Sequence, residues 1–526
     1  MKRRIILSFL GFSLALLAPS TVKATDFKLS YQINYQLDEQ GNAVVKQEIE
    51  LQNLTRNRYV ADYTFSPRGE KWQEVRAFNA AGELPLEVKE KDGEQEIKVI
   101  LGPQTAGWQK ITRWTMNYKI ASQARQRGRL WELILPRLET PLPLNNYQLT
   151  ISVPLSYGPL LYALPAAAKE EIKEGRRYFF YHSTPAREVA QRGLEMTWGD
   201  YQLFNFKLLY HLQNPLNTEA FSEIALLPHL PPGQKIYLSQ LSPAPRTIKT
   251  DLDQNILALY LLAPGEKLTI QFQGQAQVRF FPPTQGWPRQ QDEEALRAQY
   301  TRPARYWPVN DQQIQKVVQE VRGEEKNHSL VAEKLYRFTV KELSYNQNRF
   351  QNPVQRLGAR EALNQPDNAV CMEYTDLLIT LLRAAEIPAR ELDGYAYAAS
   401  ADRPLPQDIL HSWVQFYDPQ HQVWRAVDPT WESTAGRDYF NQLDLERIIF
   451  VVKGLDSEKP YPAGSYKLPQ QSPQQDIFIQ PTAQWQKGVQ PLLLWWQNQP
   501  QQRPQADFWG NLLQKIEEQW RQWQQR

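Results

Sequence analysis

Cysteine is nearly absent from this chain of 526 residues, in which Cys371 is the only one. A disulfide within the chain is therefore excluded, and the fold must be stabilised by packing instead of covalent cross-links. We also expect no lipid anchor on a processed N-terminal cysteine, because no cysteine lies directly after the apolar segment near the start of the chain. A hydrophobic content of 42% and an aromatic content of 12% are sufficient for folded cores in about three domains.

The first 24 residues have the three parts of a secretory signal peptide. Lys2, Arg3 and Arg4 precede an apolar run of about 15 residues, and the small residues of Val22-Lys23-Ala24 suit cleavage. The run is shorter than the ~20 residues that span a bilayer, which favours cleavage over the alternative of an uncleaved anchor. We therefore expect a secreted, extracytoplasmic or cell-surface protein.

Cleavage would also change the charge of the chain. Residues 1–24 contain four cations and no acids, so the formal charge falls from +3 to about −1. A near-neutral chain lacks the basic face that nucleic acid requires, so we expect no nucleic-acid partner.

Two β-rich, sandwich-like domains are predicted at residues 25–155 and 156–285. Apolar and polar residues alternate in FKLSYQINYQL, from Phe27 to Leu37, and again in NNYQLTISVP. This period of two is typical of a sheet with one buried face. The second region alternates from Leu268 to Phe272 and has Pro-rich loops. Neither region shows a cluster of titratable groups that can be assembled into a site.

Beyond the Pro-rich stretch FFPPTQGWP the pattern becomes helical. Apolar residues from Ile314 to Val321 recur at helical spacing, and Asn310 and Asp311 are candidate N-caps. A second helix, SLVAEKLYRFTVKEL, and later strands predict an α+β domain over residues 300–455.

The tail, residues 465–526, is rich in Gln, Pro and Trp, and we expect its beginning to be poorly ordered. An apolar stripe near its end predicts an amphipathic helix. The stripe consists of Trp509, Leu513, Ile516, Trp520 and Trp523. Such a helix either docks on the protein or contacts a membrane surface, where Trp is favoured. Its mostly Gln polar face favours docking on the protein.

The single cysteine begins the predicted apolar helix CMEYTDLLITLLRAAEI, with Asn368 as the expected N-cap. A helix N-terminus favours a thiolate, although an unpaired cysteine is more often a small core residue. Further along, HSWVQFY and VWRAVDPTW predict a hairpin, with His411 near its beginning and Asp428 near its end. Antiparallel pairing brings those ends together, so that the carboxylate can orient and polarise the imidazole.

These motifs resemble the transglutaminase-like superfamily, which has a papain-like thiol fold. The resemblance covers about residues 305–435 and rests on the cysteine helix, EIPAR, DGY, the H-x-W of His411, Trp424 and the D-P-T of Asp428. It implies that Cys371 is the nucleophile, His411 the general base and acid, and Asp428 the orienting carboxylate. Ala369 and Glu386 stand where the family usually has glycine.

Three functions remain open. The first is a secreted thiol acyltransferase that forms a thioester with a protein or peptide carboxamide and passes the acyl group to an amine or water. The second is a cysteine peptidase or amidase with the same triad, and the third is a non-catalytic surface scaffold. The intact triad argues against the scaffold, but acceptor choice depends on cleft shape and water access.

The remaining candidates are expected to be structural. His421 suits a hairpin turn, Trp413 and Trp424 suit the core, and Arg390 suits an ion pair. The other histidines have no metal-ligand spacing, so we expect neither a metal nor a cofactor.

Overall fold

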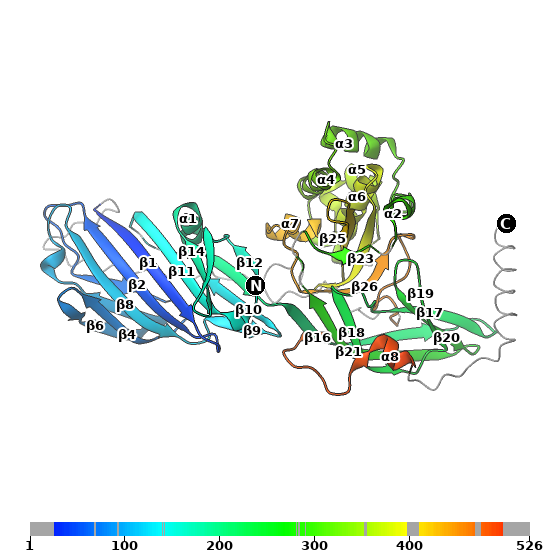
Figure 1. Cartoon of the computed structure of the whole chain (residues 1–526), viewed down its shortest axis with the longest axis horizontal. Helices are drawn as coiled ribbons and strands as arrows, with labels where there is room; N and C mark the ends of the chain where they lie inside the picture. The colour runs from blue at the N-terminus through cyan, green and yellow to red at the C-terminus, as the bar shows by residue number, and fades with distance from the viewer. Residues whose placement is uncertain are drawn as a thin grey trace. The chain divides into compact units, whose positions relative to one another are not determined.

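The computed structural model describes residues 26–497, apart from 68–69, 92–93, 139, 141, 280, 282–283, 290, 352–354, 397–409 and 469–474. The predicted signal peptide and the predicted helix with the apolar stripe from Trp509 to Trp523 lie outside these residues. The chain divides into two compact units between Gln202 and Leu203 (Figure 1). In the described part, no helix is long and apolar enough to cross a membrane.

Unit 1 is rich in strands. Its main sheet has eight strands in the order β13-β14-β11-β1-β2-β8-β4-β5, and a second sheet has the order β12-β15-β10-β9. The alternation in β1 is as predicted, since Phe27, Leu29, Tyr31 and Ile33 are buried. The elements are β1 (Phe27–Leu37), β2 (Ala43–Asn53), β3 (Asp62–Phe65), β4 (Trp72–Asn79), β5 (Gly82–Leu84), β6 (Leu86–Lys91), β7 (Glu94–Ile100), β8 (Ile111–Ile120), β9 (Ala124–Arg127), β10 (Leu130–Leu135), β11 (Leu144–Pro154), β12 (Leu160–Leu164), β13 (Lys169–Lys173), β14 (Arg176–Tyr181), α1 (Ser183–Arg192) and β15 (Leu194–Trp198).

The boundary predicted between residues 155 and 156 is wrong. Strand β14 pairs with β11, and β15 pairs with β10, so the chain beyond residue 155 completes sheets that began before it. The hydrophobic pattern identified strands on both sides of the boundary, but it does not determine which strands pair.

Unit 2 begins within the first strand of a β module, which we define as residues 201–279 together with 477–497. Its elements are β16 (Tyr201–Gln213), β17 (Ala220–Leu226), β18 (Gln234–Ser242), β19 (Thr247–Thr250), β20 (Ile256–Leu262), β21 (Lys267–Arg279), β27 (Ile477–Pro481), β28 (Gln490–Pro491) and α8 (Leu492–Gln497). Because β27 pairs with β16 and β28 with β18, the tail contributes strands to this module. The expected poor order at the beginning of the tail is therefore wrong for residues 477–497.

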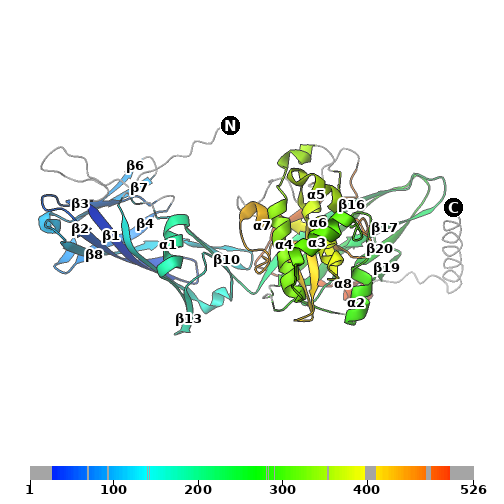
Figure 2. The same cartoon turned by 90° about the horizontal axis from the view of Figure 1, so that it is seen from above.

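The second part of unit 2 is the α+β domain. It contains β22 (Trp287–Pro288), α2 (Glu293–Tyr300), α3 (Gln312–Arg322), α4 (His328–Glu342), α5 (Ala359–Asn364), α6 (Cys371–Ala384), β23 (Ala389–Ala396), β24 (Leu410–Asp418), β25 (Val423–Val427), α7 (Pro429–Ala435) and β26 (Arg447–Lys453). The strands form an antiparallel sheet in the order β22-β25-β24-β23-β26. Helix α6 packs against β23 and β24 and contacts α3, α4, α5 and α7. Figures 1 and 2 show α3 to α6 gathered over one side of this sheet.

Strand β26 lies at the edge of that sheet. Two buried amide side chains of the β module form hydrogen bonds with the backbone groups on its outer side. Gln234 donates Nε2 to Ile449 O at 2.8 Å and accepts from Ile449 N at 2.8 Å. Asn255 makes the same pair of bonds with Val452, both at 2.7 Å. We call this arrangement the amide clamp. It joins the β module to the α+β domain by hydrogen bonds that a neighbouring strand would otherwise provide.

We expect Gln234→Ala and Asn255→Ala each to lower the free energy of unfolding of unit 2 by about 2–4 kcal/mol. Each change leaves one buried N–H and one buried C=O of β26 without a protein partner. Gln240→Ala is the matched control, because Gln240 is exposed on the same strand, β18. The control should change stability by less than about 0.5 kcal/mol. Chemical denaturation measures the differences, and equally small losses for all three variants would contradict the clamp.

Candidate active site

Cys371 is the first residue of α6, and its side chain is 7% exposed. The N-cap is Val370, with an extended backbone, and not the expected Asn368, which ends a short 3-10 turn. The carboxylate of Glu373 takes over the capping function and accepts a hydrogen bond from Val370 N at 3.0 Å. Cys371 thus lies in the N-terminal turn of a helix, where the backbone favours negative charge.

The segment that leads into α6 is held by a buried ion pair. Arg349 donates to Glu373 Oε2 at 2.5 Å and to Asn368 O at 2.8 Å. On the other side, Asn346 N donates to Ala369 O at 2.8 Å. The short SYN segment therefore lies beside the approach to the cysteine and fixes its backbone.

His411 and Asp428 meet as the predicted hairpin requires. His411 lies on β24 and Asp428 directly follows β25, and the pairing of Val414 with Val427 brings these positions together. The His411 Nε2 atom is 2.7 Å from Asp428 Oδ2, and both side chains are buried. Asp428 also caps α7, since its Oδ1 accepts from Trp431 N at 3.0 Å. The carboxylate is thus fixed by a helix start as well as by the imidazole.

A further partner of Asp428 was not predicted. Arg447 begins β26, is 3% exposed and donates from Nη2 to Asp428 Oδ2 at 2.7 Å. Its Nη1 donates to Asp444. The guanidinium lies 4.2 Å from the ring centroid of Trp431 and 5.0 Å from that of Tyr439. In the sequence Arg447 is a single cation at the beginning of the apolar run IIFVV, and nothing in that pattern indicates its partner.

This arrangement keeps Asp428 ionised. Burial alone would raise the pKa of Asp428, but the charges of His411 and Arg447 and the hydrogen bonds lower it to about 2. Burial also tends to lower the pKa of Arg447, yet Asp444 and Asp428 raise it above its ordinary value. Both members of the Asp428–Arg447 pair therefore stay charged at neutral pH.

The other predicted residues have structural positions. Trp413 and Trp424 are buried in the core as expected, and the Trp413 ring lies 5.9 Å from that of His411. His421 is in the hairpin turn, 2.9 Å from Asp418. Arg390 donates to Gln415 at 2.7 Å and lies over the Trp424 ring at 4.3 Å. Besides this amide and this ring, the charge of the Asp253 carboxylate also acts on Arg390.

The two positions without the expected glycine differ in backbone conformation. Ala369 has φ −95° and ψ 145°, which is extended backbone open to any residue. Glu386 has φ 62°, in the left-handed region that favours glycine. It follows the end of α6, where Glu386 N donates to Arg383 O at 3.0 Å and Ile387 N to Leu382 O at 2.9 Å. These bonds form the Schellman pattern, so the backbone strain lies at the end of α6 opposite the thiol.

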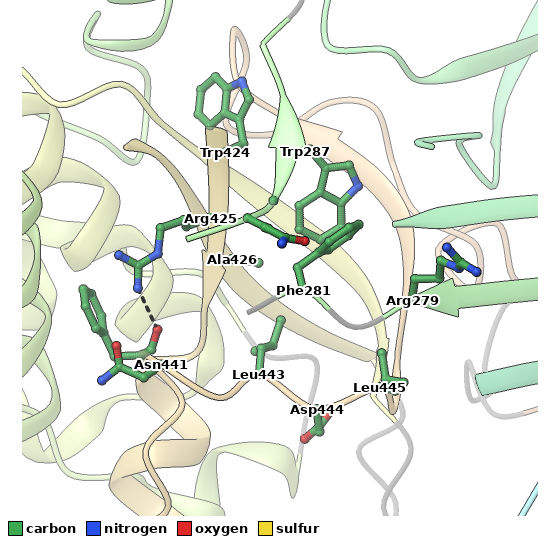
Figure 3. Close-up of a pocket in the computed structure, with 13 residues that line it drawn as sticks. Arg279, Phe281, Trp287, Trp424, Arg425, Ala426, Asn441, Leu443, Asp444 and Leu445 are labelled. Atoms are coloured by element: carbon green, nitrogen blue, oxygen red, sulfur yellow. Dashed lines mark hydrogen bonds between the residues drawn. The ribbon is translucent and has the colours of Figure 1, made fainter. Parts of the chain in front are cut away.

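A small pocket of about 50 Å³ lies beside β25. Figure 3 shows Trp287 and Phe281 close together near its centre, with Leu443, Asp444 and Leu445 along its lower side. Asp444 therefore belongs both to the pocket and to the ion pair with Arg447. The described residues that line the pocket do not include the cysteine, the histidine or the aspartate of the site, so the pocket adjoins the support of Asp428 and not the thiol.

Residues 315–429 match the family model described as the transglutaminase-like superfamily. The matched segment contains Cys371, His411 and Asp428. A protein-glutamine gamma-glutamyltransferase from Pseudomonas aeruginosa is 32% identical over 84 residues, which are 15% of this chain and 12% of that protein. The match thus spans only a small part of this relative.

Solved structures show more distant similarity. A provisionally assigned cysteine protease from Cytophaga hutchinsonii has 15% identity and a TM-score of 0.37, over 54% of this chain and 89% of its own. A provisionally assigned protease from Parabacteroides distasonis has 13% identity and a TM-score of 0.22, over 77% and 71% of the two chains. An M1 zinc metallopeptidase from Deinococcus radiodurans has 11% identity and a TM-score of 0.21, over 36% and 43%. Similarities this distant do not indicate a function.

We expect Glu386→Gly to stabilise unit 2 by about 1 kcal/mol, because glycine adopts positive φ without steric cost. Ala385→Gly is the matched control one residue earlier. Ala385 has φ −85° and is buried, so glycine there should destabilise by about 0.5–1 kcal/mol. Thermal denaturation of both variants tests the assignment, and two shifts of the same sign would contradict it.

The loss of stability at acid pH tests whether Asp428 is held in its ionised form. A carboxyl group with a lowered pKa contributes stability above its unfolded value of 3.8 and loses that contribution as the pH falls through about 2. Asp428→Asn should be less stable than the wild type at neutral pH, because it leaves Arg447 without its buried carboxylate. We expect this difference to narrow by about 2 kcal/mol between pH 5 and pH 2.

The control for this experiment is Asp367→Asn, which changes an exposed carboxylate in the same domain. It should keep the acid dependence of the wild type. Parallel stability curves for the wild type and Asp428→Asn would show that Asp428 is not held in its ionised form.

Proposed function

Because residues 315–429 form a transglutaminase-like domain, we propose that this chain is a thiol acyltransferase of the transglutaminase type. Cys371 forms a thioester with a carboxamide donor and passes the acyl group to an amine or to water. The observation that carries the proposal is the buried His411–Asp428 pair at 2.7 Å, on a hairpin that packs against the helix begun by Cys371. The arrangement supplies a nucleophile, a base and an orienting carboxylate on three rigid elements.

In the first half of the reaction, the Cys371 thiol gives its proton to His411 Nδ1, since Nε2 is engaged by Asp428. The sulfur then attacks the carboxamide carbon, and the carbonyl oxygen takes the electron pair of the broken π bond. As the carbonyl re-forms, the C–N bond breaks and the leaving nitrogen takes the proton from Nδ1. Ammonia or an amine departs, and an acyl thioester remains on the sulfur.

In the second half, the acceptor attacks the thioester carbon and gives a proton to His411. The C–S bond breaks, the thiolate recovers a proton, and the product is an amide with an amine acceptor or a carboxylic acid with water. The negative oxygen of each tetrahedral intermediate needs a hydrogen-bond donor. We assign this role to the backbone N–H of Cys371, because amides at a helix start point towards an anion placed there.

The donor in this proposal is a glutamine-type carboxamide on a protein or peptide, and the acceptor is a primary amine or water. The proposal also places the mature chain outside the cytoplasm. The support for that location is the basic, apolar and small-residue order of residues 1–24.

The test incubates the mature chain, residues 25–526, with a biotinylated primary amine and a glutamine-rich protein such as casein. We expect label on the protein with the wild type and none with Cys371→Ala, which lacks the nucleophile. His411→Ala should reduce the rate by at least 10²-fold, the usual range for loss of a general acid–base. His421→Ala, on the turn of the same hairpin, is the matched control and should keep full activity.

The products distinguish transfer from hydrolysis. Cys371-dependent deamidation or cleavage without labelling would assign the same triad to a hydrolase. Labelling that persists in Cys371→Ala, or a thiol that is alkylated only above about pH 8.5, would contradict an activated nucleophile.

A further inference from the structure

We propose that Arg447 is a positioning residue that controls how tightly His411 holds a proton during the reaction. The proposal rests on the proposed function, because it concerns the same histidine. Arg447 is not expected to touch the substrate. It acts through Asp428, the carboxylate to which both side chains donate.

Two side chains that can carry a positive charge form hydrogen bonds with the same oxygen atom. His411 Nε2 and Arg447 Nη2 each lie 2.7 Å from Asp428 Oδ2. The two nitrogens are therefore no more than about 5.4 Å apart, in a region where all three side chains are at most 5% exposed. At this separation and degree of burial, two positive charges repel each other strongly.

This repulsion favours the release of the proton from His411. Without Arg447, the full negative charge of Asp428 would stabilise a protonated His411 and hold its proton tightly. With Arg447 present, part of that charge is already neutralised, so the imidazolium gives up its proton more easily. The proposed mechanism requires His411 both to bind and to release a proton, because it takes one from the thiol and later returns one to the leaving nitrogen.

The position of Arg447 is fixed from several directions. Its guanidinium lies against the rings of Trp431 and Tyr439, and Asp444 holds its second nitrogen. Trp431 in turn donates its backbone N–H to the other oxygen of Asp428. Removing Arg447 therefore takes a fixed positive charge away from the carboxylate that faces His411, while Trp431 N still holds its other oxygen.

The other polar groups around this cluster are neutral or paired with one another. The Tyr336 hydroxyl, on α4, lies 2.9 Å from the backbone oxygen of Asp428 and 2.8 Å from Glu432 Oε2 and shares its one proton between these acceptors, and Glu432 pairs with Arg337. Burial raises the pKa of Tyr336 and of Tyr439, so both phenols stay neutral. Asp428 bonds the imidazole directly and Arg447 bonds the same oxygen, while Asp444 bonds Arg447 and Arg437 lies over the far ring, that of Tyr439, at 5.2 Å.

The single cysteine makes a substrate-free experiment possible, because every alkylation of the chain at a thiol occurs at Cys371. The rate with iodoacetate is measured from pH 4 to pH 10 and divided by the rate with iodoacetamide. Both rates rise as the thiolate forms, so the ratio cancels that dependence. An imidazolium beside the thiolate attracts only the anionic reagent, and the ratio falls where His411 loses its proton.

Three variants should change the pH at which the rate ratio falls, each by a different amount. Arg447→Gln removes the cation and should raise this pH by about 1 unit. Asp444→Asn leaves the full charge of Arg447 to act on Asp428 and should lower this pH by about 0.5 unit. Arg447→Lys keeps the charge, so this pH should stay within about 0.3 unit of the wild-type value.

The outcomes separate the two proposals. If the rate ratio falls at the wild-type pH in both Arg447→Gln and Asp444→Asn, Arg447 only stabilises the fold and the inference is wrong. This holds even if the melting temperatures of the variants change. If Arg447→Gln does not fold, the shift in Asp444→Asn decides alone. A wild-type chain in which both reagents show one rise near pH 8.5 and the ratio never falls would overturn the proposed function itself.

Discussion

The carboxylate of Asp428 is the point on which the rest of the α+β domain depends. One oxygen accepts from His411 on β24 and from Arg447 on β26, and the other begins α7 through Trp431 N. Two strands of the sheet and one helix thus meet at a group that is fully buried. Burying an ionised carboxylate is costly unless every lone pair is engaged, and here the same bonds that offset that cost also align the imidazole.

The support of the site extends beyond the α+β domain. Arg447 belongs to β26, an edge strand whose outer backbone groups are bonded by Gln234 and Asn255 of the β module. The β module therefore stabilises part of the α+β domain directly. It completes the edge strand that carries the partner of Asp428, and the two parts belong to one compact unit.

Local patterns in the sequence predicted local structure well. The alternation in β1 and the meeting of His411 with Asp428 follow from a period of two and from one short hairpin. Arg447 and the amide clamp could not be predicted, because their partners depend on which distant segments pair. An isolated Arg before an apolar strand, or a single Gln or Asn near a loop, looks the same in sequence whether it is solvated or buried. The wrong boundary at residue 155 has the same cause.

The two strands that the tail contributes also affect how the chain folds. Leu208 of β16 pairs with Ile477 of β27, so the whole α+β domain is synthesised between the two partners. Contacts with such a large sequence separation form slowly, because the loop between them must be closed first. Unit 1 closes its sheets within the first 202 residues, whereas unit 2 completes its β module only after β28 has been made. The two units therefore mature in succession, with the edges of β16 and β18 exposed until the tail strands arrive.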